Sequence, residues 1–197
     1  ERSGKAFRIE MRQPTGWQTI QTISLSGDHD FYPVSASADR KSLLVVTNID
    51  SEFNYIANYD LTTGKISKVL YADPNHDVDA GFLLDGELAS YNVDGDFPHP
   101  VRVDPVLKEY QQQVDALLKD RHNYIASNSV DFSRIIFYSV SDHSPGRYYT
   151  IDFNTKKVQF FYSQFPMLEK EQLNPVQKFQ FSSRDGLPIE GYLTLPK

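Results

Sequence analysis

The sequence repeats itself at an offset of 92 residues. The segment Tyr32–Asp39 (YPVSASAD) corresponds to Tyr124–Asp131 (YIASNSVD), and the same register continues without a gap as far as Lys65 and Lys157. The matched pairs include Tyr32 and Tyr124, Ser35 and Ser127, Ser37 and Ser129, Asp39 and Asp131, Asp60 and Asp152, Thr63 and Thr155. A register held over this length indicates two copies of one structural unit.

Each copy predicts four strands separated by polar turns. In the first copy the predicted strands are Phe31–Ser35, Leu43–Asn48, Tyr55–Leu61 and Lys65–Tyr71. The repeated aspartates lie in the turns, where an Asp side chain can accept hydrogen bonds from its own backbone. Gly64 ends the LTTG turn and can adopt positive φ. We therefore interpret Asp39 and Asp131 as turn formers and not as ligands.

The offset is twice 46 residues, which predicts one further unit between the two copies. Val78–Leu84 and Glu87–Val93 supply two of its strands around an Asp-Gly turn. Its second half departs from the strand pattern, because apolar residues recur at helical spacing from Asp104 to Lys119. Asp104 is the predicted N-cap, and Pro105 takes the first helical position. Upstream, Phe7–Arg12 and Trp17–Ile23 are predicted to be the last two strands of an earlier unit.

Repeats of about 40–50 residues with four strands each are typical of β-propeller blades. The aromatic content of 13% agrees with strands, because large flat side chains pack well on a pleated surface. The predicted fold class is all-β. The architecture is a partial β-propeller of about three and a half four-stranded antiparallel blades, with one inserted helix and a C-terminal hairpin. Since closed propellers have about 4–8 blades, we expect the chain to be part of a ring.

The repeat stops after Tyr162. Residues 166–175 form a predicted linker between two prolines, and Val176–Ser183 and Ile189–Leu195 form a predicted hairpin around Asp185-Gly186. The expected organisation is therefore propeller blades over residues 1–165, a linker over 166–175, and over 176–197 the first hairpin of a further domain.

The segment Ser183–Pro196 (SRDGLPIEGYLTLP) resembles the junction at which a β-propeller meets an α/β-hydrolase domain in prolyl oligopeptidase-family serine peptidases. The similarity extends from Trp17 to the end of the chain, and the bacterial acylaminoacyl-peptidases and dipeptidyl-peptidase-like members are the most similar branch. Further matching segments are His76–Asp79, Asp104-Pro105, Asp115–Leu118 and Ser144–Tyr149. The resemblance implies that the hairpin opens a hydrolase domain, and that the complete protein has a Ser-Asp-His triad.

No residue of this sequence matches that triad. The chain contains neither a G-x-S-x-G pattern nor a His-Gly-Gly run. We therefore expect no catalytic, cofactor-binding or metal-binding residue within it, and no cofactor.

Two groups of acidic residues offer alternative sites. His76, Asp77 and Asp79, with Asp73 nearby, have side chains that bind metals, but strand alternation around Val78 explains a polar strand entrance without an ion. Paired propeller glutamates hold the substrate's amino terminus in dipeptidyl peptidases. Here Glu169 and Glu171 flank Lys170 in the linker, so we interpret them as a solvated charge cluster. None of the five histidines has a partner spacing that indicates catalysis.

Composition excludes several classes of function. The net charge of −6 argues against nucleic-acid binding, which requires clustered Lys and Arg. No cysteine is present, so the chain has no disulfide or thiolate metal site. No apolar run approaches the ~20 residues of a membrane span. The chain begins at Glu1 and not at Met, and we expect that an upstream portion has been removed. A bacterial periplasm and a cytoplasm are equally compatible with these features.

These features are compatible with two functions of the chain. In the first, the chain is the non-catalytic propeller portion of a serine peptidase, and it controls the access of short peptides to its own hydrolase domain. In the second, it is a stand-alone propeller that acts as a scaffold for protein partners. The 176–195 hairpin favours the first, because a closed propeller does not need it. We also expect self-association through open propeller edges, since blade faces that lack a neighbour leave apolar side chains uncovered.

Overall fold

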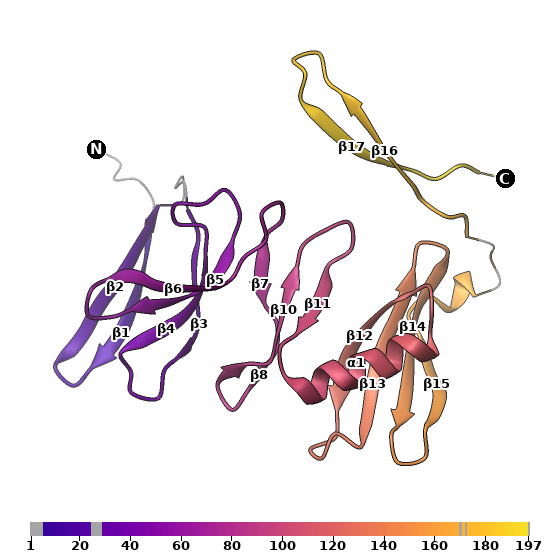
Figure 1. Cartoon of the computed structure of the whole chain (residues 1–197), viewed down its shortest axis with the longest axis horizontal. Helices are drawn as coiled ribbons and strands as arrows, with labels where there is room; N and C mark the ends of the chain where they lie inside the picture. The colour runs from indigo at the N-terminus through magenta and orange to yellow at the C-terminus, as the bar shows by residue number, and fades with distance from the viewer. Residues whose placement is uncertain (1–5, 25–28, 170, 172, 197) are drawn as a thin grey trace. The chain divides into compact units, whose positions relative to one another are not determined.

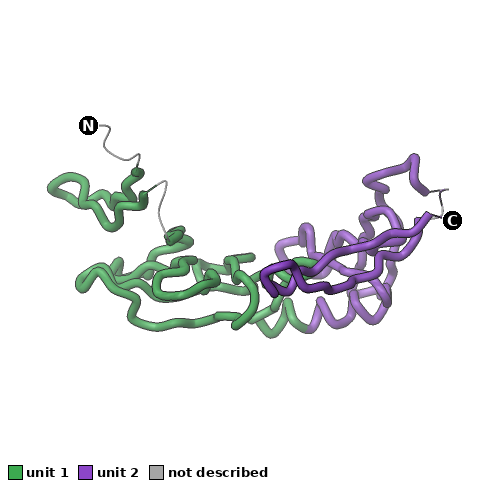
Figure 2. Tube along the Cα trace, turned by 90° about the horizontal axis from the view of Figure 1, so that it is seen from above, with its two compact units in different colours: residues 1–108 green, residues 109–197 purple. Residues whose placement is uncertain are grey.

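The structure is a computed structural model that describes residues 6–24, 29–169, 171 and 173–196. The chain divides into two compact units, residues 1–108 and residues 109–197 (Figure 2). Each unit is described by itself below.

The first unit contains a hairpin and two larger antiparallel sheets (Figure 1). The hairpin consists of β1 (Ala6–Gln13) and β2 (Gly16–Ser24). A four-stranded sheet follows in the order β3-β4-β5-β6, with bounds Phe31–Ala36, Ser42–Thr47, Tyr55–Asp60 and Lys65–Tyr71. A three-stranded sheet has the order β11-β10-β7, with bounds His99–Arg102, Ser90–Val93 and Val78–Ala80. The short strands β8 (Leu83–Leu84) and β9 (Glu87–Leu88) pair with each other.

The second unit contains most of helix α1 (Pro105–Leu117), a four-stranded sheet and a hairpin. The sheet has the order β12-β13-β14-β15, with bounds His122–Asn128, Arg134–Ser141, Ser144–Asp152 and Lys157–Ser163. A 3-10 turn, η1 (Pro166–Leu168), leads toward the hairpin of β16 (Gln177–Ser182) and β17 (Pro188–Leu193). Among the described residues, neither helix is long and apolar enough to cross a membrane.

The repeat predicted from the sequence is confirmed by the strand register. In the β3–β6 sheet Ser42 pairs with Asp60, and in the β12–β15 sheet Arg134 pairs with Asp152, 92 residues later in each strand. Both sheets shift register at the same place, between Pro33 and Ser35 and between Ile125 and Ser127. The two sheets therefore share their strand order, the pairing at their turns and the register shift in their first strand pair.

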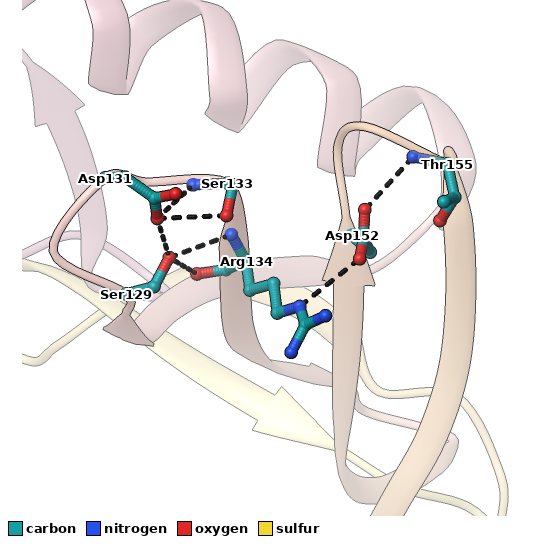
Figure 3. Close-up of polar contacts among 6 residues, drawn as sticks. All are labelled: Ser129, Asp131, Ser133, Arg134, Asp152 and Thr155. Carbon is teal, nitrogen blue, oxygen red and sulfur yellow. Dashed lines mark hydrogen bonds and ion pairs between the residues drawn. The ribbon is translucent and has the colours of Figure 1, made fainter.

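The repeated aspartates form equivalent turns, as predicted. Asp131 accepts hydrogen bonds from the Ser129 hydroxyl at 2.6 Å and from the Ser133 amide at 3.1 Å (Figure 3). The hydrogen bond from Ser129 is the main reason that the pKa of Asp131 is lowered to about 2. In the first copy Asp39 accepts from the Ser37 hydroxyl at 2.7 Å and from the Lys41 amide at 3.0 Å. These turn hydrogen bonds thus explain why the Ser-x-Asp spacing is repeated within the chain, without any ligand.

The second turn of the repeat differs in one residue, and this difference gives a stability prediction. Gly64 has φ +68°, and its counterpart Lys156 has φ +53°, where an L side chain is strained. We expect Lys156→Gly to raise the free energy of unfolding of the second unit by about 1 kcal/mol. Hydrogen exchange at the β14 and β15 amides measures the change in the second unit, and Gly64→Ala, with the opposite expected sign in the first unit, is the control. A destabilised Lys156→Gly variant would contradict the strain argument.

Three clusters of buried side chains form the hydrophobic cores, two within the first unit and one within the second. In the first unit Phe31, Val45 and Tyr59 pack against Ile23 of the β1–β2 hairpin, and Val46 and Ile56 pack against Val78 and Val93 on the other face of the β3–β6 sheet. The β3–β6 sheet is therefore covered on both faces. In the second unit the third cluster lies between helix α1 and one face of the β12–β15 sheet, and its buried members are Val114, Ile135, Phe137 and Ile151.

Helix α1 begins where the sequence predicts and ends two residues before the predicted Lys119. The Asp104 carboxylate accepts a hydrogen bond from the Leu107 amide at 2.9 Å, as the predicted N-cap should, and Pro105 is the first helical residue. At the other end Asp120 has φ +59°, a left-handed conformation that stops a helix.

The repeat that lies between the two copies differs from the prediction. The strands predicted over Val78–Leu84 and Glu87–Val93 are each interrupted, because the amides of Gly81 and Phe82 both donate to the Ser90 carbonyl, at 3.0 and 3.1 Å. A Cβ on Gly81 would lie 2.8 Å from that carbonyl oxygen, so this close approach requires glycine. Strand β11 was not predicted, and it takes the place beside β10 before the helix begins.

Candidate functional site

The first unit contains a cavity of about 650 Å³ with an acidic lining. Its acidic residues are Asp77 and Asp94 from loops and Asp79 from β7. Its other lining residues are Tyr32, Val46, Asn54, Val78, Asn92 and Pro98. None of these described lining residues is Lys, Arg or His, so three carboxylates lie around one cavity without a basic residue among them.

Backbone contacts fix the positions of the acidic groups. The Asp77 carboxylate accepts a hydrogen bond from the Asn54 amide at 2.7 Å, and its carbonyl accepts from the Asp94 amide at 2.9 Å. Asp79 pairs with Asn92 across β7 and β10. The Asn54 Oδ1 atom is buried and has no hydrogen-bond partner among the described residues. A buried acceptor of this kind is costly unless a donor from outside the protein reaches it.

The charge around the cavity also affects Tyr32. The pKa of this phenol is raised, chiefly by the negative charge of Asp30 and to a smaller extent by burial and by Asp79. Because its described lining contains three carboxylates and no basic side chain, the cavity favours cationic groups, such as an ammonium or a guanidinium, over anionic ones.

The sequence identified only part of this site. It singled out His76, Asp77 and Asp79 together, but the structure separates them. The His76 ring is 3.0 Å from the Asp73 carboxylate, outside the cavity lining, whereas Asp77 and Asp79 line the cavity with Asp94. Val78 is buried and the two flanking aspartates are exposed, as the predicted alternation requires. The described residues contain no group of three or more His, Asp or Glu side chains that could hold a metal ion.

The interpretation of Glu169 as part of a solvated charge cluster is wrong. Its carboxylate forms a two-point ion pair with Arg147 of β14, with Nε 3.0 Å from Oε1, and also accepts a hydrogen bond from the Ser163 hydroxyl at 2.6 Å. These contacts, of which the one to Arg147 has the largest effect, lower the pKa of Glu169. Glu171 is exposed. The sequence separation of 22 residues between Arg147 and Glu169 gave no signal from which the pair could be predicted.

The linker is attached to the sheet at a second point. The Asp142 carboxylate, in the turn between β13 and β14, accepts a hydrogen bond from the Val176 amide at 2.7 Å. This contact is the largest cause of the lowered pKa of Asp142. The segment between η1 and β16 is therefore held to the β12–β15 sheet near both of its ends.

Neither a family model nor a curated protein sequence matches the chain. Solved structures do match its fold. A puromycin-hydrolyzing peptidase of Mycobacterium tuberculosis aligns with a TM-score of 0.58 at 14% identity, covering 92% of this chain and 27% of its own. The S511A mutant of a puromycin hydrolase, complexed with PGG, aligns with a TM-score of 0.50 at 13% identity, covering 91% of this chain and 28% of its own.

These comparisons establish the fold class. The chain is an all-β protein whose described residues include one α-helix, and its larger sheets are those of a partial β-propeller. It spans about a quarter of the length of these two solved structures.

Proposed function

We propose that the chain is the non-catalytic propeller portion of a serine peptidase that acts on short peptides, and that it controls their access to a hydrolase domain. In this proposal residues 1–165 are propeller blades, residues 166–175 are the linker, and residues 176–197 begin the hydrolase domain. The fold similarity to two hydrolases supports it, as does the β16–β17 hairpin, which forms a two-stranded sheet apart from the blades.

The acidic cavity is the observation that carries the role in substrate access. A peptide with a free amino terminus bears a positive charge at neutral pH. The carboxylates of Asp77, Asp79 and Asp94 attract that charge, and the unpartnered Asn54 Oδ1 can accept a hydrogen bond from an N–H group. The cavity then selects short peptides by their amino termini.

Replacing Asp94 tests this role. We expect Asp94→Asn to weaken the binding of phenylalanyl-glycyl-glycinamide by roughly tenfold at pH 6.5, because one of three carboxylates loses its charge. Isothermal titration measures the affinity. Asp85→Asn is the matched control, since Asp85 is an exposed turn residue with φ +51°, a conformation that asparagine also adopts, and it does not line the cavity.

The N-acetylated peptide completes the experiment. It has no positive charge, and we expect no measurable binding to the unmodified chain. Equal binding of the acetylated and free peptides, or equal loss in Asp85→Asn and Asp94→Asn, would show that the cavity does not recognise an amino terminus.

A further inference from the structure

A row of polar side chains crosses the helix-facing side of the β12–β15 sheet. Strand pairing places Asn123 opposite Ser139, Ser139 opposite Arg147, and Arg147 opposite Ser163, so each strand contributes one residue. Because side chains alternate along a strand, Ser139 lies on the same face as Phe137 of the buried cluster. Asn123, Ser139 and Ser163 are 4%, 0% and 6% exposed. We call these four residues the polar row, and its three uncharged members are buried.

The first copy of the repeat shows that the blade does not require a polar row at this place. The residues 92 positions before the first three members are Phe31, Thr47 and Tyr55, and they pair in the same order. Phe31 and Tyr55 are buried members of a hydrophobic cluster, and the Thr47 hydroxyl donates to the Asp30 carbonyl at 2.6 Å. The guanidinium and its polar neighbours are therefore particular to the second copy.

The Glu169 carboxylate occupies the charged end of the polar row. Arg147 binds it at two points, with Nε 3.0 Å from Oε1, and the Ser163 hydroxyl donates to the same oxygen at 2.6 Å. Arg121 supplies a second positive charge, which lowers the pKa of Glu169 further after the larger effects of Arg147 and Ser163. The Arg121 guanidinium is held by the Ser144 hydroxyl at 2.8 Å. One carboxylate thus interacts with two guanidinium groups.

Unpartnered polar atoms adjoin this ion pair. The hydroxyl oxygens of Ser139 and Ser141 and the Asn123 Oδ1 atom are buried, and none has a hydrogen-bond partner among the described residues. Ser139 lies directly opposite Arg147 in the strand register. Buried polar atoms of this kind cost free energy unless a group from outside the protein reaches them. The polar row therefore has the hydrogen-bonding capacity for a ligand beside its arginine.

We propose that Arg147, Ser163 and Ser139 form a carboxylate-binding site. The Glu169 carboxylate is its internal occupant, and a carboxylate from outside the chain can replace it. The planar guanidinium matches the two oxygens of a carboxylate, and the serine hydroxyls donate to an anion. Because Glu169 directly follows η1, the ligand and this 3-10 turn compete for one site. This inference goes beyond the role of the acidic cavity and does not depend on it.

Two sources of carboxylate fit the site. A simple carboxylic acid offers only its two oxygens, whereas the carboxyl terminus of a peptide also has an amide N–H close to its carboxylate. The unpartnered Asn123 Oδ1 can only accept a hydrogen bond, so it suits that N–H and not a second anion. The carboxylate is common to both sources, and a series of ligands separates them.

Removing the internal occupant tests the site. We expect Glu169→Ala to bind N-acetyl-glycyl-glycine at least tenfold more tightly than the unmodified chain does, because the competing carboxylate is gone. Nuclear magnetic resonance of the Arg147 Nε–H group measures the binding at this arginine. Asp152→Ala is the matched control, since it frees Arg134 of the same sheet, whose side chain is 76% exposed (Figure 3). We expect no gain there, because an exposed guanidinium binds a carboxylate weakly.

The ligand series is measured on Glu169→Ala. Acetate supplies the charge alone, N-acetyl-glycyl-glycine supplies the charge and an amide, and N-acetyl-glycyl-glycinamide supplies no charge. We expect the peptide acid to bind more tightly than acetate and the peptide amide not to bind. Equal binding of acetate and the peptide acid would still support the site, as one for simple acids. The acetyl group removes the positive charge that the acidic cavity requires, so this series is independent of that cavity.

A second substitution separates the two-point geometry from charge alone. We expect Arg147→Lys in the Glu169→Ala background to lose the gain in affinity, although the positive charge is kept, because an ammonium cannot bind both oxygens as a planar fork does. Circular dichroism confirms that each variant is folded. The proposal is overturned if folded Glu169→Ala shows no gain, if Asp152→Ala gains equally, or if the peptide amide binds as well as the acid.

Discussion

Replacing Phe137 by alanine is expected to lower the free energy of unfolding of the second unit by about 4 kcal/mol. Phe137 is fully buried, and its ring stacks on Tyr149 with centroids 5.6 Å apart. Ile135 and Ile151 of the sheet and Val114 of the helix belong to the same buried cluster. The substitution leaves a cavity between two regular elements, which cannot collapse far enough to fill it.

The measurement must report on the second unit alone, because the two units need not unfold together. Hydrogen exchange at the β13 and β14 amides in increasing urea meets this requirement. Phe161→Ala is the matched control, since Phe161 is in the same sheet but 62% exposed, and we expect it to change stability by less than about 1 kcal/mol. Equal losses in the two variants would mean that the helix does not pack on this face of the sheet.

Much of the fold could be predicted because the decisive interactions are local. The Asp131 carboxylate accepts hydrogen bonds from Ser129 and Ser133, which lie two residues away on either side. The Asp104 carboxylate caps helix α1 by accepting from the amide three residues later. Interactions of this range leave a pattern in the sequence, and the pattern recurs 92 residues apart. The strand register of both four-stranded sheets then follows from the turns that fix it.

The features that were missed depend on contacts between distant residues. In the repeat between the two copies, the strands are interrupted where the Gly81 amide donates to the Ser90 carbonyl. No side-chain pattern encodes this backbone contact. Asp94 was not recognised as part of the acidic cavity, because only the pairing of β7 with β10 brings the segments around Asp79 and Asp94 together.

The Arg147–Glu169 pair is the clearest case of a distant contact, and it gives the second large effect. We expect Arg147→Ala to accelerate hydrogen exchange at the amides of Leu168, Glu169 and Glu171 at least tenfold. Without the guanidinium, the Glu169 carboxylate keeps the hydrogen bond from the Ser163 hydroxyl but loses its two-point ion pair, so the 3-10 turn is held more weakly to the sheet. Arg134→Ala is the matched control, because the Arg134 side chain is 76% exposed in its pair with Asp152, and exposed pairs contribute little.

Acidification should reproduce the effect of Arg147→Ala in the unmodified chain. The pKa of Glu169 is lowered by Arg147 and Ser163, and that of Asp142 by the Val176 amide, so both groups bind protons more weakly in the folded state than in the unfolded one. The stabilisation from both contacts is therefore complete above about pH 5, where these carboxylates are ionised even in the unfolded chain. It is lost as the pH falls below about 4 and through the lowered pKa values of the folded state. Exchange in the 166–176 segment, corrected for the intrinsic rate at each pH, should then rise in the unmodified chain. In Arg147→Ala it should change less, because one of the two contacts is already absent. If protection of this segment is the same at pH 3 and pH 7, the two carboxylates do not hold the linker to the sheet.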